Sequence, residues 1–343
     1  MRKLKMVWGR ALLGAPAWGV YLAAVALCVL TGLLLVLLET RLAGSLRGWL
    51  APLSMSLLAG GFLGWAINSS KDSRNSNNWE IAQGLRKREF FVHYQPIVTA
   101  NSGHCIGVEV LARWRHPVQG FIPSQLFIPA AEEAGLIVAL TRYLLRCVGH
   151  ELGQIMLPPG FVVGVNISAS HLTTRDIIED CRLLLSVLKD KQIRLVLEVS
   201  ERVALEEHEE SLKVVQELKA MGIQLALDDF GAGHADRQYL QKWGFDYLKV
   251  EKGYVSAIGK DSFRSNILDG ILVNANQLGL KVVVKGVETQ GQQSYLHAKG
   301  FQYLQGFFFG KPMTLNHFRR WLYAEVAHEA ESPRPAASRA EGA

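Results

Sequence analysis

Two adjacent carboxylates, Asp228 and Asp229, stand at the end of an apolar run and directly before a glycine-rich turn, in the segment LALDDFGAG at residues 225–233. Neighbouring carboxylates repel each other unless a cation or a proton removes part of the negative charge. The pair therefore either holds a hard divalent metal ion or has a raised pKa. A helix N-cap followed by a turn would also place aspartate here, so the pair alone does not decide.

Polar side chains that could bind a metal ion or take part in catalysis recur at the ends of other apolar runs. They are Glu109, Asn166, Glu198, Lys249 with Glu251, Lys285 with Glu288, and Gln305. Oxygen ligands without histidine or thiolate favour Mg²⁺ or Mn²⁺ over zinc, and two such ions can hold the attacking and leaving oxygens of a phosphoryl displacement. Lys249 could then hold the attacking water, and Arg113 could bind a phosphate through two hydrogen bonds. Each side chain could instead cap a helix or form an ion pair at a barrel rim.

Short apolar runs that alternate with longer helical patterns must position these residues. The runs are Phe90 to Val98, Cys105 to Ala112, Phe161 to Ile167, Ile193 to Val199, Ile223 to Asp229, Phe245 to Val250, Leu280 to Val284 and Phe301 to Gln305. From the third onward they are almost continuously apolar, as expected for parallel strands that are covered on both faces. Eight strand–helix units predict an α/β fold of the modified (β/α)₈ TIM barrel type, whose catalytic residues come from the C-terminal strand ends. Only residues 99–104 join the first two runs, which is too short for a parallel crossover, so we expect one antiparallel strand.

Two uncharged stretches precede the barrel, and each exceeds the roughly 20 residues that span a bilayer. They lie between Arg10 and Glu39 and between Arg47 and Lys71, and they predict a transmembrane hairpin over residues 1–67 with spans at about 15–38 and 49–67. A cleaved signal peptide is the alternative, but the first run is long for one and a second span follows. Basic residues outside both spans predict that both ends are cytoplasmic, so we expect a multi-pass protein of the cytoplasmic membrane with its barrel in the cytoplasm.

The remaining segments complete the expected organisation. A polar linker occupies residues 68–78, the barrel residues 79–325, and a disordered tail rich in Ala, Glu, Pro and Ser residues 328–343. Much of the net charge of +6 adjoins the spans, where anionic lipid attracts it, so we expect no DNA or RNA partner. The spacing of Gly60 and Gly64 favours close helix packing and hence a homodimer. Three of the four cysteines are expected to be reduced core residues in a cytosolic domain.

A set of ordered motifs resembles the EAL family of bacterial cyclic-di-GMP phosphodiesterases, with EVL in place of EAL. The motifs are EVLARW at residues 109–114, RHP at 115–117, GFIP at 120–123, FIPAAE at 127–132, YQPIV at 94–98, NIS at 166–168, EVSE at 198–201, DDFG at 228–231, KVE at 249–251, GVET at 286–289 and QGF at 305–307. They extend over about residues 78–323, the whole expected soluble domain.

The resemblance implies a role for each of these positions. Glu109, Asn166, Glu198, Asp228 and Asp229 would be metal ligands, and Gln95, Leu111, Arg113 and Gln305 would contact cyclic-di-GMP. Lys249, which would position the attacking water, and Glu288 are the catalytic candidates, and Glu201 would brace the loop after the aspartate pair. The implied reaction is Mg²⁺- or Mn²⁺-dependent hydrolysis of one phosphodiester to pGpG.

The sequence departs from this family at one position above all. Lys285 stands where active members ordinarily have a glutamate that binds the second metal ion, and an ammonium cannot coordinate a metal. Ala232, His234 and Glu251 are smaller departures. Two hypotheses follow: a membrane-tethered phosphodiesterase whose activity Lys285 impairs, or a catalytically inactive cyclic-di-GMP receptor or protein-interaction module.

Overall fold

The computed structural model describes residues 80–202, 205, 208–231, 235–259 and 262–331. The chain divides into two compact units, residues 1–77 and 78–343, and the described residues all belong to the second. The predicted transmembrane hairpin and linker therefore lie outside the described residues. Among the residues that the structure describes, no helix combines the length and the apolar character needed to cross a membrane.

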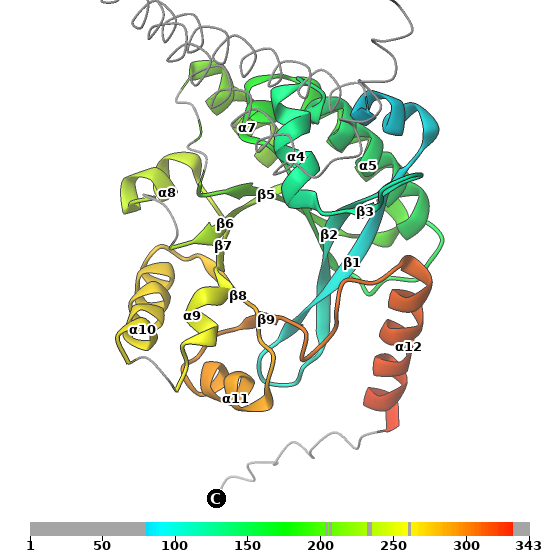
Figure 1. Ribbon diagram of the computed structural model, residues 1–343. Helices are drawn as coiled ribbons and strands as arrows, with labels where there is room; N and C mark the ends of the chain where they lie inside the picture. The colour runs from blue at the N-terminus through cyan, green and yellow to red at the C-terminus, as the bar shows by residue number, and fades with distance from the viewer. Residues whose placement is uncertain (1–79, 203–204, 206–207, 232–234, 260–261, 332–343) are drawn as a thin grey trace, which may run out of the picture. The chain divides into compact units, whose positions relative to one another are not determined.

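The described residues of the second unit contain nine strands in one mixed sheet, and this sheet closes on itself as a barrel (Figure 1). They are β1 (Phe90–Thr99), β2 (Cys105–His116), β3 (Gly120–Ile122), β4 (Val162–Asn166), β5 (Arg194–Ser200), β6 (Gln224–Phe230), β7 (Tyr247–Val250), β8 (Lys281–Lys285) and β9 (Tyr303–Gln305). Their order is β1-β9-β8-β7-β6-β5-β4-β2-β3, and an additional pairing of β1 with β2 closes the ring of eight. This architecture confirms the predicted α/β modified TIM barrel.

The first strand runs against its neighbours. β1 pairs antiparallel with both β2 and β9, whereas β2 and β4 through β9 pair in parallel around the rest of the ring. The prediction of one antiparallel strand in the barrel is therefore confirmed. The sequence analysis missed β3, which pairs with the end of β2 through Trp114↔Ile122 and extends β2 to His116. The residues of β3 are exposed or partly exposed, so they form no apolar run that would mark a strand.

Helices surround the barrel (Figure 1). They are α4 (Ser124–Glu133), α5 (Ile137–Leu152), α6 (Asp176–Val187), α7 (Glu209–Ala220), α8 (Arg237–Trp243), α9 (Lys252–Ser256), α10 (Ser262–Gln277), α11 (Gln290–Ala298) and α12 (Leu315–Glu331), with the 3₁₀ turns η2 (Ala169–Thr173) and η3 (Lys189–Lys191). Helix α12 continues to Glu331, so residues 328–331, which the sequence analysis assigned to the tail, are helical. Alanine and glutamate are good helix formers, so residues 327–331 extend the helix.

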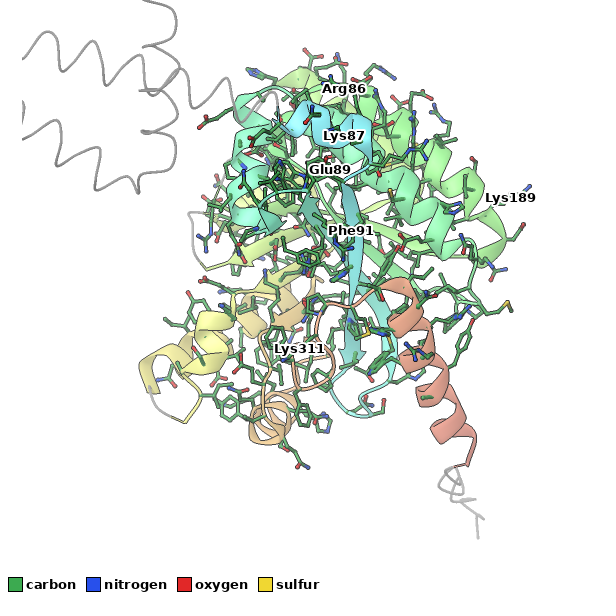
Figure 2. All side chains as sticks on the ribbon, turned by 45° about the vertical axis from the view of Figure 1, so that its right-hand side comes forward. Arg86, Lys87, Glu89, Phe91, Lys189 and Lys311 are labelled. Carbon is green, nitrogen blue, oxygen red and sulfur yellow. The ribbon has the colours of Figure 1, made fainter. Side chains whose placement is uncertain are left out.

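The chain enters the barrel through helical residues 80–87, which are followed directly by β1. Arg86 and Lys87 are exposed on this helix, and Glu89 and Phe91 lie beyond it where β1 begins (Figure 2). The Trp114 indole Nε1–H donates to Glu89 Oε2 at 3.0 Å. This bond fixes the start of β1 against β2.

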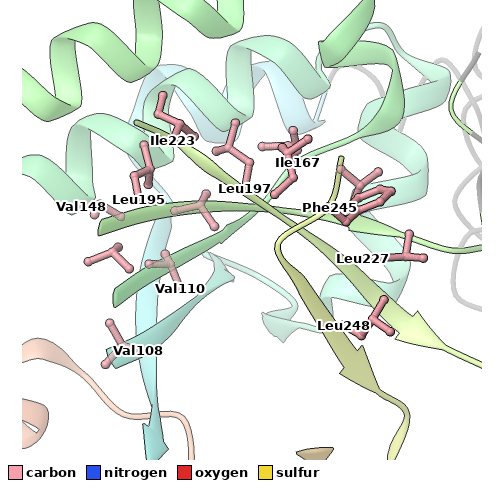
Figure 3. Close-up of a cluster of buried hydrophobic side chains, with 14 of the residues drawn as sticks. Val108, Val110, Val148, Ile167, Leu195, Leu197, Ile223, Leu227, Phe245 and Leu248 are labelled. Atoms are coloured by element: carbon pink, nitrogen blue, oxygen red, sulfur yellow. The ribbon is translucent and has the colours of Figure 1, made fainter. Parts of the chain in front are cut away.

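Two apolar layers hold the barrel together. The larger packs strand residues such as Val108, Leu197 and Leu248 under the surrounding helices (Figure 3). The smaller fills the barrel interior with one buried residue from each of six strands, namely Ile97, Val162, Val196, Ala226, Tyr247 and Val283. Such an interior layer is typical of eight-stranded barrels, which are packed cores and not pores.

Gly306 allows the chain after β9 to lie against the backbone of Val287. A Cβ atom at Gly306 would stand 2.0 Å from the Val287 carbonyl oxygen and 2.3 Å from its nitrogen. Val287 N–H donates to the Gln305 carbonyl, and Phe308 N–H donates to the Val287 carbonyl. The two backbones therefore cannot separate without the loss of these hydrogen bonds.

We expect Gly306→Ala to lower the free energy of unfolding by roughly 2 kcal/mol or more, because backbone atoms must shift to accept the methyl group. Gly270→Ala is the matched control, since Gly270 lies exposed in α10 with no atom within 4 Å of the added Cβ. Alanine there should be neutral or stabilise by up to about 1 kcal/mol. Urea unfolding measures both, and an unchanged midpoint for Gly306→Ala would contradict the prediction.

Candidate functional site

A polar layer lies one step above the interior apolar layer, at the C-terminal end of the barrel. Side chains two positions apart on a strand point to the same face. Interior apolar residues are therefore followed inside the barrel by polar ones: Val196 by Glu198, Ala226 by Asp228, Tyr247 by Lys249, Val283 by Lys285 and Tyr303 by Gln305. Glu109 joins this layer from β2. The strand ends that the sequence singled out thus converge on one site.

Lys249 stands at the centre of this layer and is only 1% exposed. Its Nζ lies 2.8 Å from Glu109 Oε2 and also forms an ion pair with Glu198. Both carboxylates are themselves buried. Burial alone would lower the pKa of Lys249, but the attraction of Glu109 and Glu198 outweighs it and raises that pKa. Lys249 is therefore a fixed positive charge inside the barrel.

The carboxylates of Glu109 and Glu198 respond differently to this setting. Burial would raise the pKa of Glu109, but the charges of Lys249 and Lys285 outweigh it, with hydrogen bonds from Lys249 and Asn166, and lower the pKa to about 2. Burial raises the pKa of Glu198 to about 8 against the attraction of Lys249, and repulsion by Glu109 and Asp228 adds to the rise. The interior therefore holds more negative charge than Lys249 alone can balance.

Gly164 on β4 makes room for the Glu198 side chain. A Cβ atom at Gly164 would stand 2.2 Å from Glu198 Oε1. Gly164 lies beside Val196 in the parallel ladder, and Asn166 lies beside Glu198. The sequence analysis did not identify this glycine, although a lone glycine within an apolar strand is a signal of close approach.

The residues present fit one divalent ion. Glu109, Glu198 and Asp228 each offer a carboxylate oxygen, and these oxygens lie within 4.8 Å of one another. Gln305 Nε2 donates to Glu109 Oε2 at 2.8 Å, whereas its buried Oε1 accepts no hydrogen bond from a described residue. Asn166 Nδ2 donates to Glu109 Oε1 at 2.9 Å, which leaves its own oxygen for another partner. Such a set of oxygen donors suits Mg²⁺ or Mn²⁺.

The residues present do not fit a second ion. Lys285 Nζ lies 2.5 Å from Asp228 Oδ1 and 2.6 Å from Asp229 Oδ1, so its ammonium occupies the space between the two aspartates. Burial would lower the pKa of Lys285, and repulsion by Lys249 acts in the same direction. The combined attraction of Asp228, Glu109 and Asp229 is stronger, so the net effect raises that pKa. A charged ammonium therefore takes the oxygens that a second divalent ion would need.

Asp229 reaches this site through an unusual backbone conformation. Consecutive strand residues normally point to opposite faces, so Asp228 and Asp229 should diverge. Asp229 has φ 55°, and the pairing of β6 with β7 shifts register between Leu227 and Phe230. The left-handed conformation, which aspartate tolerates better than most residues, turns Asp229 back toward Lys285. The sequence predicted the pair but could not predict this turn.

Glu201 lies beneath the loop that follows the aspartate pair. Its carboxylate accepts hydrogen bonds from Gly231 N–H at 2.8 Å and Ala235 N–H at 3.0 Å. The Tyr254 hydroxyl donates to the Gly231 carbonyl at 2.9 Å. These contacts tie the described ends of the loop to Glu201 and Tyr254, and the bracing role that the resemblance implied stays a prediction. The two unusual residues of this loop, Ala232 and His234, lie outside the described residues.

The four residues expected to contact a dinucleotide lie beside Glu109. Gln95 pairs with Glu109 across β1 and β2, and Leu111 and Arg113 follow at alternate positions of β2, each partly exposed. Burial lowers the pKa of Arg113, and the charge of Glu109 opposes this shift. Gln95, Leu111 and Arg113 therefore form a stripe that leads from the buried carboxylates toward the surface, with Gln305 at its inner end.

Two further charged residues, Glu288 and Arg202, lie a few residues beyond strand ends. Glu288 is exposed on the turn before α11, where its backbone N–H donates to Gln292 Oε1 at 2.8 Å, and its carboxylate forms no hydrogen bond or ion pair with a described residue. Arg202, which the sequence analysis did not identify, lies 3.4 Å from Asp229 Oδ2 through its Nε. Arg202 follows directly after the EVSE motif, and nothing in the sequence indicates that its side chain faces the site.

Several known proteins are similar to this chain over the same barrel. "Probable cyclic di-GMP phosphodiesterase PdeN" of Escherichia coli (strain K12) is 37% identical over 245 residues, which are 71% of this chain and 47% of that protein. "Cyclic di-GMP phosphodiesterase PdeL" of the same organism is 37% identical over 240 residues, which are 69% of this chain and 66% of that protein. The chain thus spans about half the length of PdeN.

Solved structures agree with the fold. The structure "PaMucR Phosphodiesterase, c-di-GMP complex" superimposes with a TM-score of 0.62 at 32% identity and covers 71% of this chain and 99% of that chain. The FimX EAL domain from Pseudomonas aeruginosa bound to c-di-GMP gives a TM-score of 0.57 at 22% identity, covers 68% of this chain and 96% of that chain, and supports the fold alone. Residues 78–312 match the EAL domain family, and the chain belongs to that family.

Proposed function

We propose that this chain is a cyclic-di-GMP phosphodiesterase of the EAL type whose hydrolysis to pGpG is weakened by Lys285. The observation that carries the proposal is the buried set of Glu109, Glu198 and Asp228 around Lys249 at the C-terminal strand ends. The names of PdeN and PdeL, and the cyclic-di-GMP complex of MucR, support the same substrate.

Glu109, Glu198 and Asp228, with Asn166, are the residues that would hold Mg²⁺ or Mn²⁺. The ion, when bound, supplies positive charge to the scissile phosphate and lowers the pKa of water. Glu198, which is crowded by Glu109 and Asp228, would need no proton beside such a charge.

The other side chains bind the dinucleotide and the attacking water. Arg113 is placed to pair with a phosphate, and Gln95, Leu111 and Gln305 line the same stripe. Lys249 uses two of its three N–H groups on Glu109 and Glu198, so one N–H remains to orient a water molecule. In the reaction that water adds to one phosphorus, one ester oxygen leaves with a proton, and the ring opens.

A second candidate function is a cyclic-di-GMP receptor or protein-interaction module without turnover. The contacts of Lys285 with Asp228 and Asp229 favour it, because they fill the place of the second ion. The nucleotide-binding stripe does not depend on these contacts. Binding could therefore persist where hydrolysis does not.

We also propose that residues 1–67 anchor the barrel to the bacterial inner membrane. The two uncharged stretches and the basic residues that flank them support this proposal. The short connection between the stretches cannot fold into a ligand-binding domain. Signals would then reach the barrel through the spans, the lipid or a partner, which includes a second copy of the chain.

The purified full chain in detergent should convert cyclic-di-GMP to pGpG slowly in the presence of Mn²⁺, and chelation should abolish the reaction because the first ion site would be empty. Chromatographic separation of the products measures the rate. Glu109→Gln, which removes one carboxylate of the ion site, sets the background. Binding of cyclic-di-GMP without pGpG above that background would favour the receptor, and neither binding nor turnover would overturn both functions.

Lys285→Glu should raise hydrolysis on the order of tenfold or more and make its dependence on Mn²⁺ steeper, because it exchanges a fixed cation for an oxygen ligand. Lys285→Ala is the control, since it clears the space without supplying a ligand and should leave turnover low. Unchanged rates for Lys285→Glu in an already fast enzyme would show that Lys285 does not limit the reaction. If Lys285→Glu binds the nucleotide but stays inactive, the loop changes at Ala232 and His234 become the better explanation.

A reporter fused to the C-terminus should be cytoplasmic, because basic residues flank both spans on the side of the termini. Alkaline phosphatase, which is active only in the periplasm, should be inactive when fused after Ala343, and green fluorescent protein at the same position should fluoresce. The same phosphatase fused within residues 40–46 should be active. The opposite pattern would contradict the proposed topology.

A further inference from the structure

A continuous network of ion pairs crosses the barrel rim where the second ion does not fit. Lys285 joins Asp228 to Asp229, with its Nζ at 2.5 and 2.6 Å from their Oδ1 atoms. Arg202 continues the network, because its Nε lies 3.4 Å from Asp229 Oδ2 and its Nη2 lies 3.2 Å from Glu251 Oε1. Each oxygen of the Asp229 carboxylate therefore has its own cation.

Arg202 connects three separate elements of the rim. It lies two residues beyond the end of β5, Asp229 belongs to β6, and Glu251 is the N-cap residue of α9. The planar guanidinium presents several N–H groups in a fixed fork, which suits it to bridge two carboxylates at once. Arg202 thus contacts the carboxylate oxygen of Asp229 that Lys285 does not contact.

The positive charge of the network equals that of the second divalent ion, which does not fit here. Lys285 and Arg202 together carry two positive charges, which is the charge of one divalent ion. Unlike an ion, these charges are covalently attached and cannot be removed by chelation. The carboxylates that they balance are those of Asp228, Asp229 and Glu251.

We propose that Lys285 and Arg202 together take the place of the second metal ion, with Arg202 as a positioning residue that holds Asp229 out of reach of a metal. The chain then binds one divalent ion, at Glu109, Glu198 and Asp228. The proposal rests on the proposed function for the identity of that first site, and it adds a second obstacle to metal binding beyond Lys285. Substitution of Lys285 alone would open the second position only in part.

Titration of the full chain with Mn²⁺, followed by the electron paramagnetic resonance signal of the free ion, tests this proposal without nucleotide or turnover. Wild-type protein should bind one ion, and Arg202→Gln alone should also bind one because Lys285 remains in place. Lys285→Glu should bind a second, weaker ion. Adding Arg202→Gln to Lys285→Glu should tighten that second ion by roughly two- to fivefold, as expected for the loss of one partly exposed ion pair.

Two further variants separate the effect of Arg202 from a general loss of charge. Arg175→Gln in the Lys285→Glu background is the matched control, because Arg175 is a similarly exposed arginine that pairs with Glu217, and it should leave both ions unchanged. Arg202→Lys should give a second-ion affinity between those of arginine and glutamine, since lysine keeps the charge but lacks the fork. Thermal unfolding checks that each variant is folded.

Binding of two ions by the wild-type chain would overturn the proposal. If Lys285→Glu and the double variant Lys285→Glu/Arg202→Gln bind the second ion with equal affinity, Arg202 has no part in excluding it. Absence of hydrolysis with one bound ion would contradict the proposed enzymatic function and leave this inference standing. The two failures are therefore distinguishable.

Discussion

The buried ammonium of Lys249 is the interaction on which the site depends. A charge that is only 1% exposed is costly unless partners surround it, and loss of one partner of a buried pair typically costs about 3–5 kcal/mol. Its partners Glu109 and Glu198 come from β2 and β5, whereas Lys249 belongs to β7. The charge of Lys249 is therefore neutralised only when the barrel closes and brings these strands together. The apolar layer beneath, which includes Tyr247, keeps water away from the pair.

Much of this arrangement follows from the sequence because two simple rules act together. Parallel strands place their C-terminal ends at one edge, and the two-residue period places every second side chain inside. Glu198 and Asp228 therefore meet although 30 residues separate them. The apolar runs also located the eight strands of the ring to within a few residues. Only β3 was not recognised, because its residues are exposed or partly exposed and form no apolar run.

Features that arise from three-dimensional contact were not predictable in the same way. Asp229 faces Lys285 because of a left-handed backbone conformation, and nothing in a strand pattern indicates that an aspartate will adopt it. Gly164 is needed because Glu198 lies over it, which only the register of β4 and β5 reveals. Arg202 reaches the site from beyond a strand end, where side-chain direction is not fixed by the two-residue period. The apolar pattern of the sequence thus predicts the fold, whereas the charge balance of the site depends on contacts that only the structure shows.

The charge balance of the site bears on how many divalent ions it can hold, which membership of the family does not determine. The network of ion pairs at the site, which does not include Arg113, joins five carboxylates to three side-chain cations: Glu109, Glu198, Asp228, Asp229 and Glu251 with Lys249, Lys285 and Arg202. If all were ionised, two negative charges would remain, which one divalent ion balances and a second would exceed. The high pKa of Glu198, which burial causes, has the same origin, since a proton is the alternative to that ion. A chain with the EAL fold can therefore carry side chains whose charges suit one ion at this site and not two.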